Sequence, residues 1–274
     1  MPRKKPPRKR TLASKADRYK LYVESVQSPE NEVPFFNRVF RKEYGRQPLV
    51  LREDFCGTAI ICREWVQSHR DRRAIGIDLD PEPMAWGRDN LLAELKPQVR
   101  DRISLIKGDV LTTRGLKADV LAAQNFSFFC FKTRDQLRGY FRAARRNLAR
   151  QGVMCMDIMG GGETLEEGRE ETRRERGFKY VWEQKRFDPV THDLECFIHF
   201  EFKDGSALRR AFHYQWRLWT IPELRELLLE AGFSRADVYW ENTDLETEEG
   251  NGVFRRVESA PSDPAWVSYL VAVK

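Results

Sequence analysis

The sequence predicts an α/β fold with an open, seven-stranded and mostly parallel sheet, helices on both faces, and a small antiparallel β insertion. Two observations lead to this prediction. Short apolar runs alternate with helical patterns between residues 49 and 157, as expected for successive β-α-β units. From residue 178 the chain changes to strand-like runs separated by turn signals, which is typical of antiparallel hairpins. A length of 274 residues accommodates one such domain with an insertion.

Residues 14–48 are expected to form two helices that precede the first strand and cover the site at its end. Ser14 and Asp17 resemble a capping box, and apolar residues follow at helical spacing. The second helix, about residues 32–44, is expected to end before Gly45, because glycine commonly follows the last helical turn.

Five parallel strands are expected next, each followed by polar or turn residues. They lie at about 49–51, 74–78, 103–106, 119–123 and 153–157. Helices are expected at 60–67, 81–95 and 133–150. Because helices alternate with parallel strands, both faces of the sheet should be covered.

The insertion is expected to be a three-stranded antiparallel sheet over residues 178–219. The charged segment before it, residues 163–176, is expected to be an exposed helix or a flexible loop. The predicted strands lie at 180–187, 193–202 and 208–218. Residues 49–177 and 220–274 then form the main domain, which a capped helix at 220–231 and two strands at about 236–241 and 266–273 complete.

The positive charge is concentrated at the start of the chain. The net charge is +6, and residues 1–10 contain six basic and no acidic residues, so the remaining 42 bases balance 42 acids. Residues 1–13 are expected to be a disordered tail, which is either an electrostatic arm for RNA, DNA or an acidic partner, or a solvated tail. The neutral remainder gives no reason to expect a basic body made for nucleic acid.

The apolar pattern gives no sign of a membrane or secretory segment. No run of 18 apolar residues is present, and no apolar run follows the basic residues. The five cysteines are scattered and form no C-x-x-C pair. We therefore expect a cytoplasmic protein with free buried thiols and no metal site.

Candidate site residues follow the ends of the predicted parallel strands, because ligands bind beyond the carboxyl ends of such strands. After the first strand, Gly57 allows close approach of the backbone, and the next helix offers free N–H groups. Asp78, at the end of the second strand, is placed to accept hydrogen bonds from ribose hydroxyls. Asp109, after the third strand, could accept a hydrogen bond from an adenine amino group. Together they predict a nucleotide-binding unit.

These residues resemble the motifs of the class I S-adenosylmethionine-dependent methyltransferases. The first motif of that family has an acid two residues before a Gly-x-Gly-x-Gly turn. Glu53 matches the acid, and Cys56-Gly57-Thr58 match the turn closely, whereas Phe55 and Ala59 replace two of the three glycines. The resemblance covers about residues 35–274 and implies a Rossmann-like fold and methyltransferase activity.

The resemblance also implies S-adenosylmethionine as the cofactor. Asp78 in GIDLD matches the ribose-binding acid, and Asp109 in KGDV matches the adenine-side acid. Asn125 begins the fourth motif, which faces the methyl group in such enzymes. Arg52 either binds the carboxylate of the cofactor or pairs with a neighbouring acid. The expected cofactor-binding residues are Arg52, Glu53, Cys56, Gly57, Thr58, Asp78, Leu79, Asp109, Val110, Asn125 and Phe126.

The insertion, followed by IPELRELLLEAGF, resembles the small-molecule branch of this family, in which an antiparallel sheet caps the substrate pocket. The resemblance therefore implies a small-molecule methyl acceptor. The aromatic residues of the insertion either form an alternating sheet core or a wall for a cationic amine or a flat substrate. Tyrosines of the first helix either close the pocket or pack within the helical layer. The expected substrate-binding residues are Tyr19, Tyr22, Ser127, Trp182, Tyr214 and Trp216.

Catalysis of methyl transfer requires chiefly an in-line arrangement and the exclusion of water. A general base helps where the acceptor is protonated. His213, which lies in an alternating strand pattern, is the candidate base, with a structural role as the alternative. Asn125 is the second candidate catalytic residue.

Three other functions stay open from the sequence. The first is an RNA or protein methyltransferase that uses the basic tail. The second is a nicotinamide-dependent oxidoreductase, which predicts an intact G-x-G-x-x-G turn and commonly a Tyr-x-x-x-Lys pair, and neither is present. The third is a non-catalytic S-adenosylmethionine-binding module, which the changes at Phe55 and Ala59 allow. The sequence leaves open the acceptor, the methylated atom and the oligomeric state.

Overall fold

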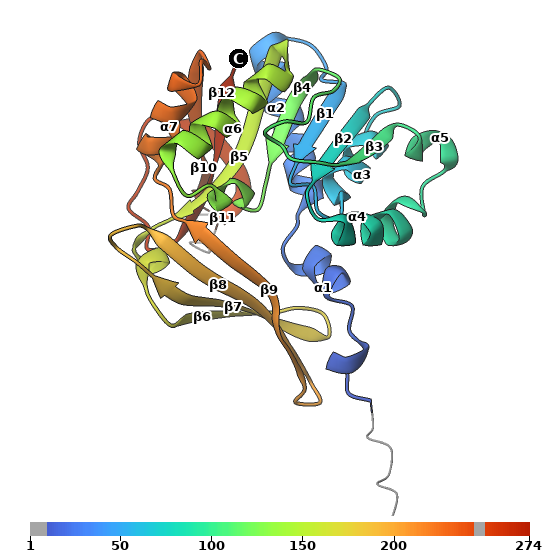
Figure 1. Ribbon diagram of the computed structural model, residues 1–274, viewed down its shortest axis with the longest axis vertical. Helices are drawn as coiled ribbons and strands as arrows, with labels where there is room; N and C mark the ends of the chain where they lie inside the picture. Colours follow the sequence, from blue (N-terminus) through green and yellow to red (C-terminus); the bar gives the residue numbers. More distant parts are fainter. Residues whose placement is uncertain (1–9, 244–249) are drawn as a thin grey trace, which may run out of the picture.

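A computed structural model of the chain describes residues 10–243 and 250–274 (Figure 1). It contains an eight-stranded sheet with the order β11-β10-β12-β5-β4-β1-β2-β3 and a separate four-stranded sheet with the order β6-β7-β8-β9. The predicted α/β fold with an antiparallel insertion is confirmed. Residues 1–9, and with them most of the predicted basic tail, lie outside the described residues.

The parallel half of the large sheet determines where a ligand-binding site is expected. Its strands are β1 (Val50–Asp54), β2 (Arg73–Asp78), β3 (Ile103–Lys107), β4 (Ala118–Ala123) and β5 (Leu148–Gly160). β1 pairs in parallel with β2 on one side and with β4 on the other. The strand order therefore reverses at β1, and a ligand crevice is expected beyond its carboxyl end.

The other half of the large sheet is antiparallel and contains one strand more than the sequence predicted. It consists of β12 (Trp266–Val273), β10 (Arg235–Thr243) and β11 (Gly250–Val257). β11 is the additional strand. It lies at the sheet edge and most of its residues are exposed, so it lacks the alternation that identifies a half-buried strand.

Helices cover both faces of the large sheet. The helices in the described residues are α1 (Arg18–Ser25), α2 (Pro29–Tyr44), α3 (Ile60–Gln67), α4 (Pro81–Gly87), α5 (Pro97–Arg100), α6 (Arg134–Asn147) and α7 (Ile221–Glu230). Among them, α2 and α3 lie on one face and α6 and α7 on the other. On one face, Val120 and Val153 join the apolar cluster of α2 and α3. On the other face, Leu121 and Met154 join the cluster of α6 and α7 (Figure 1). Successive residues of a strand thus pack against helices on opposite faces of the sheet. This confirms the prediction that helices cover both faces.

The insertion has four strands where the sequence predicted three. They are β6 (Arg169–Arg174), β7 (Phe178–Phe187), β8 (Asp193–Phe202) and β9 (Ala207–Arg217), paired antiparallel in that order. β6 lies within the segment that was expected to be an exposed helix or a loop. Its charged sequence forms an edge strand because its backbone pairs with β7, a partner that local composition does not reveal. This four-stranded sheet is called the cap sheet below.

The helix α1 connects the cap sheet to the main domain. Its N-cap is Asp17, whose carboxylate accepts hydrogen bonds from the backbone N–H groups of Tyr19 and Lys20, so the predicted start at Ser14 is wrong. The indole of Trp86 also donates to Asp17. On its other side, Leu21 packs against apolar residues of the cap sheet. Figure 1 shows α1 beside this sheet, below the large one.

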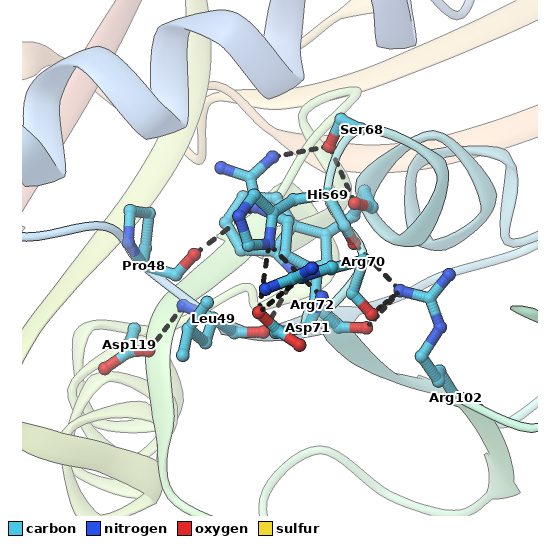
Figure 2. A network of polar contacts seen from close by, with 10 residues as sticks. Pro48, Leu49, Ser68, His69, Arg70, Asp71, Arg72, Arg102 and Asp119 are labelled. Carbon is cyan, nitrogen blue, oxygen red and sulfur yellow. Dashed lines mark hydrogen bonds and ion pairs between the residues drawn. The ribbon is translucent and has the colours of Figure 1, made fainter.

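The amino-terminal ends of the parallel strands carry a polar network (Figure 2). The buried guanidinium of Arg72 donates to the backbone oxygen of Pro48 and to the side chains of Ser68 and Asn37. It also lies 3.9 Å from the ring centroid of Trp65. These contacts join α2, α3 and β1 at the edge opposite the candidate site.

Two further predictions concern cysteines and membranes. All five cysteines are unpaired, and four are buried, but Cys130 is exposed at the end of a short surface turn. The prediction of buried thiols is therefore wrong for Cys130. No helix in the described ranges is long and apolar enough to cross a membrane.

Candidate functional site

The turn between β1 and α3 has an unusual backbone. Phe55 and Ala59 have φ values of 60°, and Gly57 has a φ of 48°, all in the left-handed region. The turn is held by backbone hydrogen bonds from Cys56 to Ile77 and from Ala59 to Cys56. These are the three positions at which the methyltransferase motif carries glycine, so the backbone shape of that motif is present without two of its glycines.

Helix α4 packs closely on this turn. A Cβ atom at Gly87 would lie 2.0 Å from the carbonyl oxygen of Thr58, so only glycine allows the contact. The hydroxyl of Thr58 donates to the amide oxygen of Gln27 over 3.1 Å. The turn is therefore fixed from two sides, by α4 and by the segment between α1 and α2.

Asp78 connects the turn to the end of β2. Its Oδ2 accepts a hydrogen bond from the N–H of Gly57 at 2.8 Å, and its Oδ1 accepts one from Asp80 at 2.9 Å. Burial raises the pKa of Asp78. Each carboxylate oxygen retains a further acceptor position for a ligand hydroxyl.

A cavity of about 410 Å³, here called the turn cavity, lies beside these residues. Its floor is the turn and the strand ends, and its cover comes from α1 and β9. The residues that line it include Arg18, Tyr19, Tyr22, Gln27, Cys56, Gly57, Thr58, Asp78, Asn125, Ser127, Phe212 and Tyr214. A cavity of this size is in the range that holds nucleotide-sized ligands.

A second cavity of about 380 Å³, here called the cap cavity, lies under the cap sheet. Tyr22, Asn125 and Tyr214 line both cavities, so the two adjoin at these residues. The cap cavity is otherwise lined by residues of α2, β5, β12 and the cap sheet, among them Glu32, Phe126, Asp157, Trp182, Trp216 and Tyr269.

Asp157 on β5 positions the junction between the cavities. Its carboxylate accepts hydrogen bonds from the N–H groups of Asn125 at 2.8 Å and Phe126 at 2.9 Å. Asn125 and Phe126 have φ values of 57° and 55°, and these hydrogen bonds hold their left-handed turn. Burial raises the pKa of Asp157 to about 7.

Aromatic side chains form one wall of the cap cavity. Tyr214 and Trp216 stack with ring centroids 4.4 Å apart, and Trp182 lies 5.9 Å from Trp216. The rings of Phe126 and Trp216 are nearly perpendicular, with centroids 6.0 Å apart. The aromatic residues predicted for substrate binding therefore form a continuous surface on the inner face of the cap sheet.

The structure brings most of the predicted ligand-contacting residues together. Those on the turn cavity are Cys56, Gly57, Thr58, Asp78, Asn125, Ser127, Tyr19, Tyr22, His213 and Tyr214. Those on the cap cavity are Tyr22, Asn125, Phe126, Trp182, Tyr214 and Trp216.

The other predicted residues do not line either cavity. Arg52 is 1% exposed, and its guanidinium pairs with Asp54 at 2.7 Å, so the alternative of an internal ion pair is the observed one. Glu53 accepts a hydrogen bond from the N–H of Cys62, and burial raises its pKa to about 8. Val110 is buried, and its carbonyl accepts from Arg52.

Leu79 and Asp109 do not line the turn cavity. Leu79 is 65% exposed directly after Asp78. Asp109 caps its own turn by accepting a hydrogen bond from the N–H of Leu111.

His213 is poorly placed to act as a base. Its imidazole pairs with Glu195 at 2.9 Å and stacks on Phe197 at 4.5 Å. His213 contributes to the lining of the turn cavity. Because side chains alternate along β9, however, its ring is directed to the face that carries Glu195 and Phe197, opposite to the face of Tyr214. The geometry therefore favours the structural role for His213.

Sequence reasoning missed two acidic residues of the cap cavity, Glu32 and Asp157. Asp157 is the last residue of the fifth predicted strand, as Asp78 is of the second. This position at a strand end could have identified Asp157 as a candidate site residue. Glu32 lies among Val33, Phe35 and Phe36 on the buried side of α2, where a charged residue is unusual.

No protein-family model matches the chain, and no curated protein matches it. Solved structures do match. DesVI of Streptomyces venezuelae is 18% identical, with a TM-score of 0.67 over 94% of this chain and 98% of that chain. An S-adenosylmethionine-dependent methyltransferase from Clostridium acetobutylicum is 16% identical, with a TM-score of 0.64 over 92% and 96%. CalS10, an amino pentose methyltransferase from Micromonospora echinaspora, is 17% identical, with a TM-score of 0.64 over 93% and 94%. This chain therefore has the fold of the S-adenosylmethionine-dependent methyltransferases.

Proposed function

We propose that this protein is an S-adenosylmethionine-dependent methyltransferase that acts on a small molecule. The observation that carries the proposal is the pair of adjoining cavities, one at the glycine-motif turn and one under an aromatic cap sheet. Such a pair suits a reaction between a cofactor and a separate acceptor. The matching solved structures include methyltransferases described as acting on an amino pentose and on sugar nitrogen.

The residues of the turn cavity fit S-adenosylmethionine. The left-handed turn lets the backbone at Gly57 approach a ligand, and Asp78 retains acceptor positions for two ribose hydroxyls. In the proposal, exposed Leu79 packs on the adenine ring and Asp109 accepts from its amino group. When bound, this cofactor supplies a sulfonium methyl group to an acceptor lone pair, and the electron pair of the carbon–sulfur bond stays on sulfur.

The protein contributes chiefly position and the exclusion of water. Tyr22, Asn125 and Tyr214 line both cavities, so in the proposal they align the acceptor with the methyl group. The cap sheet and α1 cover the reacting atoms from the solvent. A cytoplasmic location is part of the proposal, supported by five unpaired cysteines.

The first prediction tests the cofactor site. Asp78→Asn should weaken the binding of S-adenosylhomocysteine by about 10- to 100-fold, because the ribose hydroxyls lose a charged acceptor. Isothermal titration calorimetry measures this affinity. The control is Asp71→Asn, which removes an exposed carboxylate from the turn before β2 and should leave the affinity unchanged.

Two results would contradict the proposal. If the wild-type protein bound neither S-adenosylmethionine nor S-adenosylhomocysteine, the cofactor assignment would be wrong. If it bound both but transferred no labelled methyl group to any of a broad set of amine and hydroxyl metabolites, a non-catalytic binding module would be the better description.

A further inference from the structure

Glu32 is a buried acid with an incomplete set of partners. It lies on α2, is 5% exposed, and lines the cap cavity. Its Oε2 atom has no hydrogen-bond partner among the described residues. A buried carboxyl oxygen without a partner carries a large desolvation cost, which a ligand with a hydrogen-bond donor would offset.

The cap cavity is lined by more acidic than basic residues. Glu32, Asp157 and Glu171 line it, together with a single basic residue, Arg173. The guanidinium of Arg173 already donates to the backbone oxygen of Ser25 and lies 4.6 Å from the ring of Tyr180. These contacts engage its guanidinium, and among the described residues it forms no ion pair with Glu32, Asp157 or Glu171.

The aromatic wall adds to this preference for positive charge. The ring faces of tryptophan and tyrosine attract cations, and the attraction grows when the site is shielded from water. Trp182, Tyr214 and Trp216 supply three such rings opposite α2, and Tyr269 supplies another beside Glu32. An acceptor without a basic group would gain neither the contact with the carboxyl groups nor the attraction to the ring faces.

We propose that the methyl acceptor is an amine and that Glu32 binds its nitrogen. This inference rests on the proposed function, whose second cavity it assigns to a class of substrate. An amine in solution at neutral pH is an ammonium ion, which has no free lone pair. As the ammonium ion binds, the Glu32 carboxyl releases its own proton to the solvent. One N–H proton then passes from the ammonium ion to the resulting carboxylate, which leaves a neutral amine with its lone pair and a neutral Glu32 carboxyl. The freed lone pair is the nucleophile that methyl transfer requires.

Proton release should accompany amine binding. Burial, and next the nearby Asp157, holds the pKa of Glu32 well above its usual range, which favours the neutral carboxyl in the empty cavity. The bound pair of amine and Glu32 holds one proton fewer than the separate ammonium ion and carboxyl. The charged and titratable groups around Glu32 and along the cavity wall are Asp157, Glu53, Glu30, Glu171, Arg173, Tyr22, Tyr180, Tyr214 and Tyr269. Burial raises the pKa of all four tyrosines, so they stay neutral in this range.

The experiment compares phenethylamine with 2-phenylethanol, two probes of similar shape that differ in the amine. Each is titrated by calorimetry into protein saturated with S-adenosylhomocysteine, in phosphate and in Tris, whose different ionisation heats reveal proton release. The wild type should bind the amine at least about 10-fold more tightly than the alcohol and release about one proton. Glu32→Gln should lose both the preference and the release. Glu30→Gln, an exposed site on the same helix, should keep both.

The outcomes separate this inference from the proposed function. Equal binding of the two probes by the wild type, or no detectable binding of the amine, would overturn the substrate class. Retention of the preference and the proton release by Glu32→Gln would overturn the role of Glu32. Unchanged affinity of Glu32→Gln for S-adenosylhomocysteine shows that this variant is folded. Failure of S-adenosylhomocysteine to bind the wild type would instead remove the proposed function, and amine selectivity would then be measured without it.

Discussion

At the scale of single residues, the β1–α3 turn uses left-handed backbone at positions where two side chains are not glycine. A left-handed residue other than glycine costs about 1 kcal/mol or more. Phe55 and Ala59 adopt this unfavourable backbone because hydrogen bonds fix the conformation of the turn. One of these hydrogen bonds runs from the N–H of Gly57 to Asp78. The motif is therefore better recognised by its backbone shape than by its glycines.

The strain at Ala59 can be measured by stability. Ala59→Gly relieves about 1 kcal/mol of strain, and this roughly offsets the loss of a buried methyl group and the greater entropy of the unfolded chain. We expect its free energy of unfolding to change by less than about 0.5 kcal/mol. Ala143→Gly, at a buried position with ordinary helical backbone in α6, should lose about 2 kcal/mol. Urea denaturation measures both, and equal losses would show that Ala59 is unstrained.

At the scale of elements, the two ends of the parallel strands have different roles, one in forming the candidate site and the other in stabilising the fold. The carboxyl ends carry the turn, Asp78 and the Asn125 segment, which line the cavities. At the amino ends, Arg72 contacts Pro48 before β1 and Ser68 after α3 (Figure 2), and it also contacts Asn37 of α2. Chemistry and stability are therefore separated along the strand axis, and substitutions at the two ends should affect different properties.

The consequence for Arg72 is a loss of stability without a loss of cofactor binding. Arg72→Ala removes hydrogen bonds from a buried guanidinium and its contact with Trp65, and should lower the free energy of unfolding by about 3 kcal/mol. The folded variant should bind S-adenosylhomocysteine normally. Arg70→Ala, whose side chain is exposed, should change neither property by a measurable amount. A large loss of affinity in Arg72→Ala would show that the two ends are coupled.

At the scale of the whole molecule, buried acids make folding depend on pH. Burial raises the pKa of Glu53 to about 8 and that of Asp157 to about 7, and it also raises the pKa of Glu32. In an unfolded chain such acids titrate near pH 4. The folded protein therefore binds more protons between about pH 4 and pH 8, and its stability should fall as the pH rises through this range.

This dependence gives a prediction for Glu53. The wild type should be less stable at pH 8.5 than at pH 5.5, and Glu53→Gln should reduce that difference by about 2 kcal/mol or more. The neutral amide keeps an oxygen that can accept the hydrogen bond from Cys62. Urea unfolding at the two pH values measures the difference. An equal pH dependence in wild type and variant would show that Glu53 is already ionised in the folded protein.

Local patterns were sufficient for most of the fold. Apolar periodicity located the parallel strands, and the residues after them included Gly57 and Asp78, because the carboxyl ends of parallel strands meet at one edge. The same patterns missed β6 and β11. Both are largely exposed edge strands that form because their backbones pair with a neighbouring strand, and this pairing leaves no trace in the local sequence.

The sequence by itself determined the fold class, the order of its elements and the strand-end residues that face the turn cavity, because these follow from short-range periodicity and turn chemistry. Only the tertiary structure decided which way individual side chains point. The pairing of β8 with β9 turns His213 outward onto Phe197. Packing of α2 against the large sheet brings Glu32 to the same cavity as Asp157. Such positions depend on contacts between residues far apart in the chain, which no local pattern encodes.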